Sequence, residues 1–148
     1  MNTIRQIAIN ALIRPKRNQY NESSLKLTYN LDYYGKVERI PTEFQNKRKQ
    51  KIVGSLYKTH EYAQGNPCII YLHGNCGSQL EGRFLVQLFV SIGISVFCFD
   101  FAGSGNSDGD YISLGYHEKD DLTAAIEFLR TKHNIHKIAL WGRSMGAA

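Results

Sequence analysis

The stretch that decides the fold is Ile138-Ala-Leu-Trp-Gly-Arg-Ser-Met-Gly-Ala-Ala148, where an apolar run leads directly into a G-x-S-x-G pentapeptide. A serine on such a tight strand-to-helix turn takes strained backbone angles, and glycines two residues to either side leave room for the neighbouring strand and helix. The turn lifts the Ser144 hydroxyl above the sheet edge and points the amide of Met145 at a developing oxyanion. We therefore predict that Ser144 is a nucleophile and that Gly142 and Gly146 are the glycines of its turn.

A second turn, His73-Gly74-Asn75-Cys76, follows the apolar run 69–72. A turn at this place can offer a second backbone N–H, from Asn75 or Cys76, to the same oxyanion. The histidine directly before the glycine is expected to hold the loop by hydrogen bonding rather than to act in catalysis. His73 and Gly74 are therefore interpreted as structural support.

The hydrophobic rhythm between these motifs predicts alternating strands and helices. Short continuous apolar runs predict buried strands, and apolar positions at helical spacing predict two helices. The strands are expected at 68–72, 94–99 and 137–141, and the helices at 80–89 and 118–130. The order strand, helix, strand, helix, strand implies a parallel sheet with right-handed crossovers, which is an α/β fold.

The first part of the chain is more polar and rich in tyrosine. Alternating apolar and polar residues predict three strands, at 25–31, 37–44 and 52–57, with a polar turn at 45–50 that suits antiparallel pairing. Residues 1–20 are interpreted as an N-terminal segment that precedes a domain of residues 21–148. Within that segment we expect a short helix packed on the domain; a segment lying on a membrane surface, flanked by basic residues, is the alternative.

Composition limits the class of protein. The 148 residues suffice for one domain, and 18 Lys and Arg against 13 Asp and Glu give a net charge of +5. The basic run 47–51 lacks interleaved aromatic residues, so it is expected to be a solvated turn and no nucleic-acid partner is expected. Cys68, Cys76 and Cys98 form no C-x-x-C pair, which favours free thiols in a reducing compartment. No stretch approaches the ~20 apolar residues of a membrane span, so we expect a cytoplasmic protein. This expectation is compatible with peripheral contact with a membrane.

The glycine-rich loop after Asp100 and the pair of histidines at 133 and 136 are not expected to bind a ligand. Asp100 precedes a loop with glycines at 103, 105 and 109, whose spacing differs from the dinucleotide fingerprint and which leads into no helix. We interpret this loop as a structural turn and Asp100 as structural support. His133 and His136 are three residues apart without a third ligand nearby, so no metal site is expected.

Taken together, four stretches resemble the α/β-hydrolase superfamily, and within it the serine aminopeptidase-like group that includes monoacylglycerol lipase-like enzymes and acyl-protein thioesterases. These stretches are residues 71–75, 99–109, 116–122 and 140–147. The resemblance implies the N-terminal half of an α/β-hydrolase fold, with antiparallel opening strands and then parallel strands with crossover helices. It also implies a serine hydrolase that cleaves an ester, thioester or peptide bond of a small-molecule, peptide or acyl substrate. The acyl-enzyme would form on Ser144 without a cofactor.

The resemblance further implies a triad acid and a histidine on later strands and loops, whereas four residues follow Ser144. A serine hydroxyl is a weak nucleophile without its base. We therefore expect residues 21–148 to be an incomplete domain, truncated just after the serine turn and inactive alone. The alternative is a non-catalytic fragment or scaffold that binds a partner through the exposed edge of the sheet.

Overall fold

The computed structural model describes residues 2–13, 16–31, 35–58 and 65–148. In these ranges the strands are β1 (Thr28–Leu31), β2 (Gly35–Gln45), β3 (Lys51–Lys58), β4 (Cys68–Leu72), β5 (Ser95–Phe99) and β6 (Ile138–Gly142). The α-helices are α1 (Asn2–Ile13), α2 (Phe84–Phe89) and α3 (Glu118–His133). Short 3-10 helices occupy Glu22–Ser24, Gln79–Arg83, Val90–Ile92 and Ser144–Ala147.

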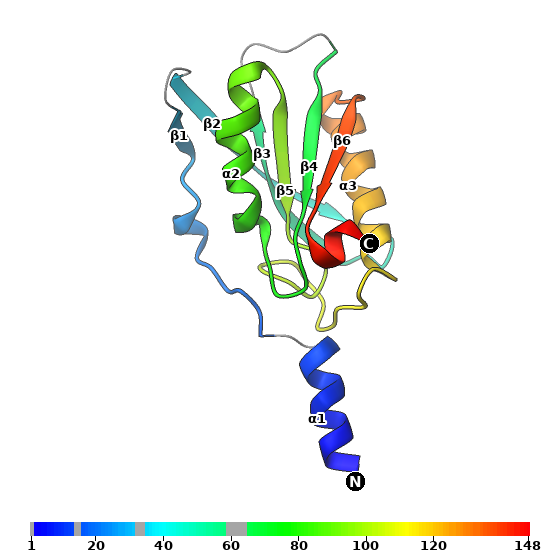
Figure 1. Cartoon of the computed structure of the whole chain (residues 1–148). Coiled ribbons are helices and arrows are strands. Elements are labelled where there is room, and N and C mark those ends of the chain that lie inside the picture. The colour runs from blue at the N-terminus through cyan, green and yellow to red at the C-terminus, as the bar shows by residue number, and fades with distance from the viewer. Residues whose placement is uncertain (1, 14–15, 32–34, 59–64) are drawn as a thin grey trace.

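The strands form a mixed sheet in the order β1-β2-β3-β5-β4-β6. The pairs β1–β2, β2–β3 and β3–β5 are antiparallel, whereas β4 pairs in parallel with both β5 and β6. Because the chain crosses from β4 to β5 in one direction and from β5 to β6 in the other, right-handed crossovers place α2 and α3 on opposite faces (Figure 1). This architecture confirms the predicted α/β fold, with antiparallel opening strands followed by parallel ones.

Each face of the sheet carries its own apolar core, because successive side chains of a buried strand point to opposite sides. Alternate residues of β5 show this: Phe97 and Phe99 belong to the cluster under α3, and Val96 and Cys98 to the cluster under α2. On the α3 side Phe44 stacks on Phe128 with ring centroids 5.0 Å apart. The strand predicted at 68–72 matches β4 residue for residue.

Two predicted elements differ in detail from those observed. The strand expected at 25–31 is confined to β1, because the 3-10 helix Glu22–Ser24 precedes it and Leu25 turns inward as a buried residue. The helix expected at 80–89 consists of a 3-10 segment, α2 and another 3-10 segment, and it ends at Gly93 in a left-handed conformation.

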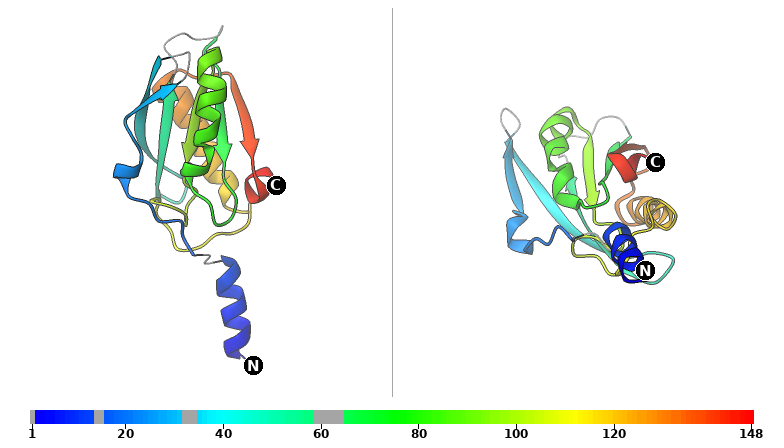
Figure 2. Two further views of the ribbon diagram at one scale, coloured as in Figure 1. Left: turned by 60° about the vertical axis from the view of Figure 1, so that its left-hand side comes forward. Right: turned by 60° about the horizontal axis from the view of Figure 1, so that its bottom comes forward.

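The expectation that the N-terminal helix packs on the domain is wrong. Helix α1 extends away from the sheet and its helices (Figures 1 and 2), and Ile4 and Ile7 are 79% and 64% exposed. A hydrogen bond from the Ile112 amide to the Ile13 carbonyl at 2.8 Å joins the end of α1 to the domain. Among the described helices, none combines the length and the apolar character needed to cross a membrane.

Candidate active site

Ser144 occupies a strained turn directly after β6. Its φ is 52°, in the left-handed region that side chains rarely adopt, and the residue is exposed. A Cβ on Gly142 would lie 2.1 Å from the carbonyl oxygen of Gly146, and a Cβ on Gly146 would lie 2.2 Å from that of Leu72. Both positions therefore exclude any side chain, as the G-x-S-x-G spacing predicts.

One backbone amide at the start of this turn, that of Met145, is available as a donor. The Arg143 amide donates to the Leu72 carbonyl at 3.0 Å, and the Gly146 amide donates to the Arg143 carbonyl at 3.0 Å. The amide of Met145 lies between them in the first turn of the 3-10 helix and donates to no acceptor in the described residues. The Met145 side chain is buried beneath the turn.

The loop that follows β4 lies against this turn. A Cβ on Gly74 would lie 3.6 Å from the Ser144 Cβ and 3.6 Å from the Arg143 carbonyl oxygen. The Gly77 amide closes the loop by donating to the Gly74 carbonyl at 2.9 Å. Across the described ranges the amides of Asn75 and Cys76 have no acceptor, and Cys76 is exposed. The structure thus brings the two sequence motifs together.

Both ring nitrogens of His73 bind main-chain atoms. Nδ1 lies 2.7 Å from the Gly74 carbonyl, and the Phe101 amide donates to Nε2 at 3.1 Å. Because Nε2 accepts, Nδ1 carries the proton and donates. The ring is fully buried, and this burial lowers the pKa of His73, so the imidazole is held neutral. His73 therefore joins the loop after β4 to the loop after β5.

An ion pair connects the serine turn to the helical segment behind the loop. Arg143 Nη1 lies 3.1 Å from Glu81 Oε1, and the Tyr71 hydroxyl donates to Glu81 Oε2 at 3.2 Å. Partial burial, aided by the Glu81 charge, raises the pKa of Tyr71 to about 12. Sequence reasoning missed this contact, because nothing in the local pattern pairs residues 81 and 143.

Asp100 is the centre of a buried polar network. Its Oδ1 accepts the Gln79 amide at 2.7 Å, and its Oδ2 accepts the Tyr20 hydroxyl at 2.6 Å and the Asn106 amide at 3.0 Å. The Gln79 side-chain amide donates to the Tyr20 hydroxyl as well. Burial, followed by the negative charge of Asp100, raises the pKa of Tyr20. Asp100 thereby fixes the end of the loop that carries Asn75 and Cys76.

The same network continues toward the antiparallel strands. The Ser55 hydroxyl donates to Gln79 Oε1 at 2.6 Å, and Arg39 Nη1 donates to Ser55 Oγ at 2.9 Å. Arg39, which is buried in β2, also pairs with Glu22 at 2.6 Å. The segment before β1 is thus bound to the loops beside Ser144.

The glycine-rich loop after Asp100 makes its hydrogen bonds within the protein. The Gly103 amide donates to the Asp108 carbonyl at 2.8 Å, and the Val53 amide donates to Ser107 Oγ at 2.9 Å. A Cβ on Gly105 would lie 2.2 Å from Asp100 Oδ2, so the chain passes directly over the carboxylate. These contacts agree with the structural turn expected from the glycine spacing.

Two acidic residues in the first turn of α3 make specific contacts beyond any interaction with the helix dipole. Asp121 accepts the Ala102 amide at 2.9 Å and pairs with Arg48 at 3.0 Å, which places part of the basic run 47–51 against the domain. Burial of Glu118 opposes its ionisation, but hydrogen bonds from Ser113 and from the Gly115 amide outweigh burial and lower its pKa.

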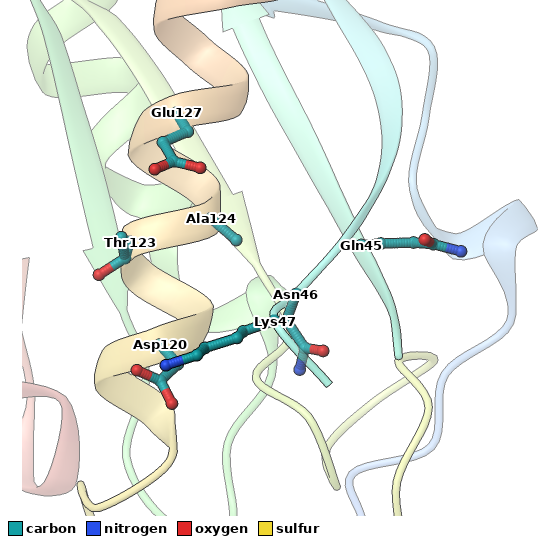
Figure 3. A pocket seen from close by; sticks show the side chains of 7 residues that line it. All are labelled: Gln45, Asn46, Lys47, Asp120, Thr123, Ala124 and Glu127. Atoms are coloured by element: carbon teal, nitrogen blue, oxygen red, sulfur yellow. The ribbon is translucent and has the colours of Figure 1, made fainter. Parts of the chain in front are cut away.

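The remaining candidate ligands lie elsewhere. The His133 ring contacts Phe128 with centroids 5.2 Å apart, and His136 Nε2 lies 2.9 Å from Asn134 Oδ1. A polar pocket of ≈ 320 Å³ opens between α3 and the end of β2, with Lys47 extending toward Asp120 (Figure 3). None of its lining residues belongs to the serine turn or to the loop after β4. A smaller hollow of ≈ 80 Å³ lies beside the turn, lined by Leu72, Phe101, Gly115, Glu118, Lys119, Leu122, Met145, Gly146 and Ala148.

A mixed sheet in this order, helices on both faces, and a serine in a left-handed turn after β6 define the α/β-hydrolase class. The chain belongs to the family described as "Serine aminopeptidase, S33", which matches residues 64–148. Relatives include the lysophosphatidylserine lipase ABHD12 of Danio rerio, 31% identical over 57% of this chain and 22% of its own length. Protein bem46 of Schizosaccharomyces pombe is 29% identical over 81% of this chain and 38% of its own length.

Solved structures agree on the fold. The Pyrococcus furiosus esterase Pf2001 superimposes with a TM-score of 0.71 and 24% identity, covering 90% of this chain and 49% of the esterase. The chain therefore spans about half of that enzyme and 22–38% of the curated relatives named above. It is a hydrolase-family chain that matches the N-terminal half of the fold.

Proposed function

We propose that Ser144 is the nucleophile of a serine hydrolase and that the amides of Met145 and of Asn75 or Cys76 form its oxyanion hole. The observation that carries the proposal is the turn itself. Ser144 holds a left-handed conformation between two glycines that tolerate no Cβ, and it lies beside the loop at Gly74. A strained, exposed serine next to free backbone donors is the arrangement that acyl transfer needs.

The reaction we propose is acyl transfer from an ester, thioester or peptide bond. Ser144 Oγ forms a bond to the acyl carbon and loses its proton to a base, and the negative charge passes to the carbonyl oxygen within reach of the amides. The bond to the alcohol, thiol or amine breaks, and the leaving group takes a proton. Water then attacks the acyl-enzyme by the same route and releases the acid.

The base of this reaction is not His73, because main-chain atoms bind both of its ring nitrogens. In the ranges that the structure describes, no histidine lies within hydrogen-bond distance of Ser144. We propose that the acid and the histidine come from the half of the fold that this chain does not match. An oxyanion hole without its triad supplies only ~10³–10⁴-fold acceleration over water, so the 148 residues alone are expected to turn over poorly.

The test is labelling by a fluorophosphonate, read by intact-mass spectrometry of the protein purified from its own cells. We expect a mass above 16.8 kDa and one label at Ser144. Ser144→Ala should abolish the label, whereas Ser91→Ala, a substitution at another exposed serine, should leave it unchanged. A label that persists in Ser144→Ala would overturn the assignment.

The same experiment separates the alternative function. Strand β6 pairs with β4, and its Leu140 and Trp141 side chains are exposed, which would suit a scaffold that binds a partner through this edge. A stable protein of 16.8 kDa whose Ser144 takes no label would favour the scaffold over the enzyme.

A further inference from the structure

We infer that α1 and the loop 111–116 form a docking surface for an anionic lipid bilayer. We call this the lipid-docking surface, and its members are Ile4, Ile7, Tyr111, Leu114 and Tyr116. The binding itself is independent of the proposed chemistry.

The helix contributes the first part of this surface. Ile4 and Ile7 are three residues apart, so they share one face of α1, and both are exposed. Helix α1 has no acidic residue in its first turn, and its charged side chain is Arg5. A helix with a branched apolar face, without acidic residues and followed by basic ones, is typical of segments that lie in the interface of a membrane.

The loop contributes the second part. The hydrogen bond from the Ile112 amide to the Ile13 carbonyl places the end of α1 beside this loop. Tyr111, Leu114 and Tyr116 are exposed. The Lys119 ammonium lies 5.2 Å from the centre of the Tyr116 ring. Tyrosine suits the headgroup region of a bilayer, because its ring is apolar and its hydroxyl stays hydrated there.

Charge decides which occupant suits the surface. Residues 1–21 contain four basic side chains and no acidic one. Lys16 is exposed, and Arg17 reaches the Ser107 carbonyl at 3.4 Å at the same edge of the domain. A second copy of this chain would bring two positive segments together, whereas anionic lipid headgroups attract each of them. We therefore commit to an anionic bilayer.

The position of the surface links it to the serine. Helix α1 leaves the domain at the edge where β6 ends and the turn of Ser144 lies (Figure 1). A bilayer bound to α1 and this loop would lie beside the edge of the sheet that carries the proposed nucleophile.

The test is sedimentation of the whole chain with vesicles of phosphatidylcholine, with and without phosphatidylserine, at low and high salt. We expect binding to the anionic vesicles that weakens as salt rises. Ile4→Gln with Ile7→Gln keeps the charge and should lower the partition coefficient by at least about tenfold, because both side chains lose their burial in the lipid. Gln6→Ala with Asn10→Ala, on another face of α1, is the matched control and should bind as the parent does.

Circular dichroism checks that each variant is folded, and Ser144→Ala separates the two proposals. Ser144→Ala should bind vesicles as the parent chain does, whether or not the fluorophosphonate labels Ser144 in the parent. Absence of binding by the parent, or equal binding by the Ile4→Gln and Ile7→Gln variant, would overturn the inference. So would a parent dimer that this variant dissociates without any change in vesicle binding.

Discussion

Replacing Gly146 by alanine should destabilise the chain sharply. The new Cβ would lie 2.2 Å from the Leu72 carbonyl oxygen and 2.6 Å from its carbon, well inside the 3.0 Å that real Cβ atoms essentially never cross. The obstacle is the backbone at the end of strand β4, which no rotamer change can move aside. Relief therefore requires the serine turn to shift away from β4.

The magnitude follows from two contributions. Forcing a methyl group into a filled space costs about 1–3 kcal/mol. Shifting the turn also weakens the hydrogen bond from Arg143 to Leu72, which is worth about 1 kcal/mol. A loss of about 3 kcal/mol of unfolding free energy corresponds to a fall of about 10 °C in Tm for a chain of this size.

Urea unfolding followed by circular dichroism measures the change, with Gly74→Ala as the matched control. A Cβ on Gly74 meets its nearest atoms at 3.6 Å, an ordinary contact, and its φ is not positive. Because alanine can adopt this backbone conformation, the control should stay within about 1 kcal/mol of the parent. If Gly146→Ala were as stable as Gly74→Ala, the close approach of the turn to β4 would be refuted.

Two further outcomes concern the buried polar groups. Burial lowers the pKa of His73 in the folded chain, so the unfolded chain binds a proton at a higher pH than the folded chain does. The free energy of unfolding should therefore decrease as the pH falls below about 6.5, by up to about 1.4 kcal/mol per pH unit. Histidine NMR should show the His73 ring still neutral where a free imidazole is protonated, and a ring that titrates like a free one would contradict the geometry. Tyr20→Phe removes the hydroxyl that donates to Asp100 and should cost about 1–3 kcal/mol in urea unfolding. The exposed Tyr116→Phe should cost little, and equal losses would argue against the network.

The parts of the fold that could be predicted are those whose signal is local. The runs at 68–72 and 94–99 are apolar on both faces because helices cover both sides of the sheet, and that burial shows directly in the sequence. The spacing of Gly142, Ser144 and Gly146 is equally local, since the clashes that demand glycine arise from the turn and the strand beside it.

The parts that could not be predicted depend on residues far apart in the chain. Tyr20, Gln79 and Asp100 are each unremarkable in their own surroundings, and only the folded loops bring them together. The same holds for Arg143 and Glu81. The failed expectation for α1 has another reason: its apolar residues indicate that the helix will be covered, but they do not say by what.

The sheet order has a consequence for how the chain is synthesised. Strands β3 and β4 follow one another in sequence, yet β5 lies between them and pairs with both. Until residue 99 has left the ribosome, the facing edges of β3 and β4 have no partner, and the second edge of β4 waits for β6. From the synthesis of β3 until that of β6, the nascent chain thus exposes apolar strand edges, which is the state in which chaperones bind and chains aggregate.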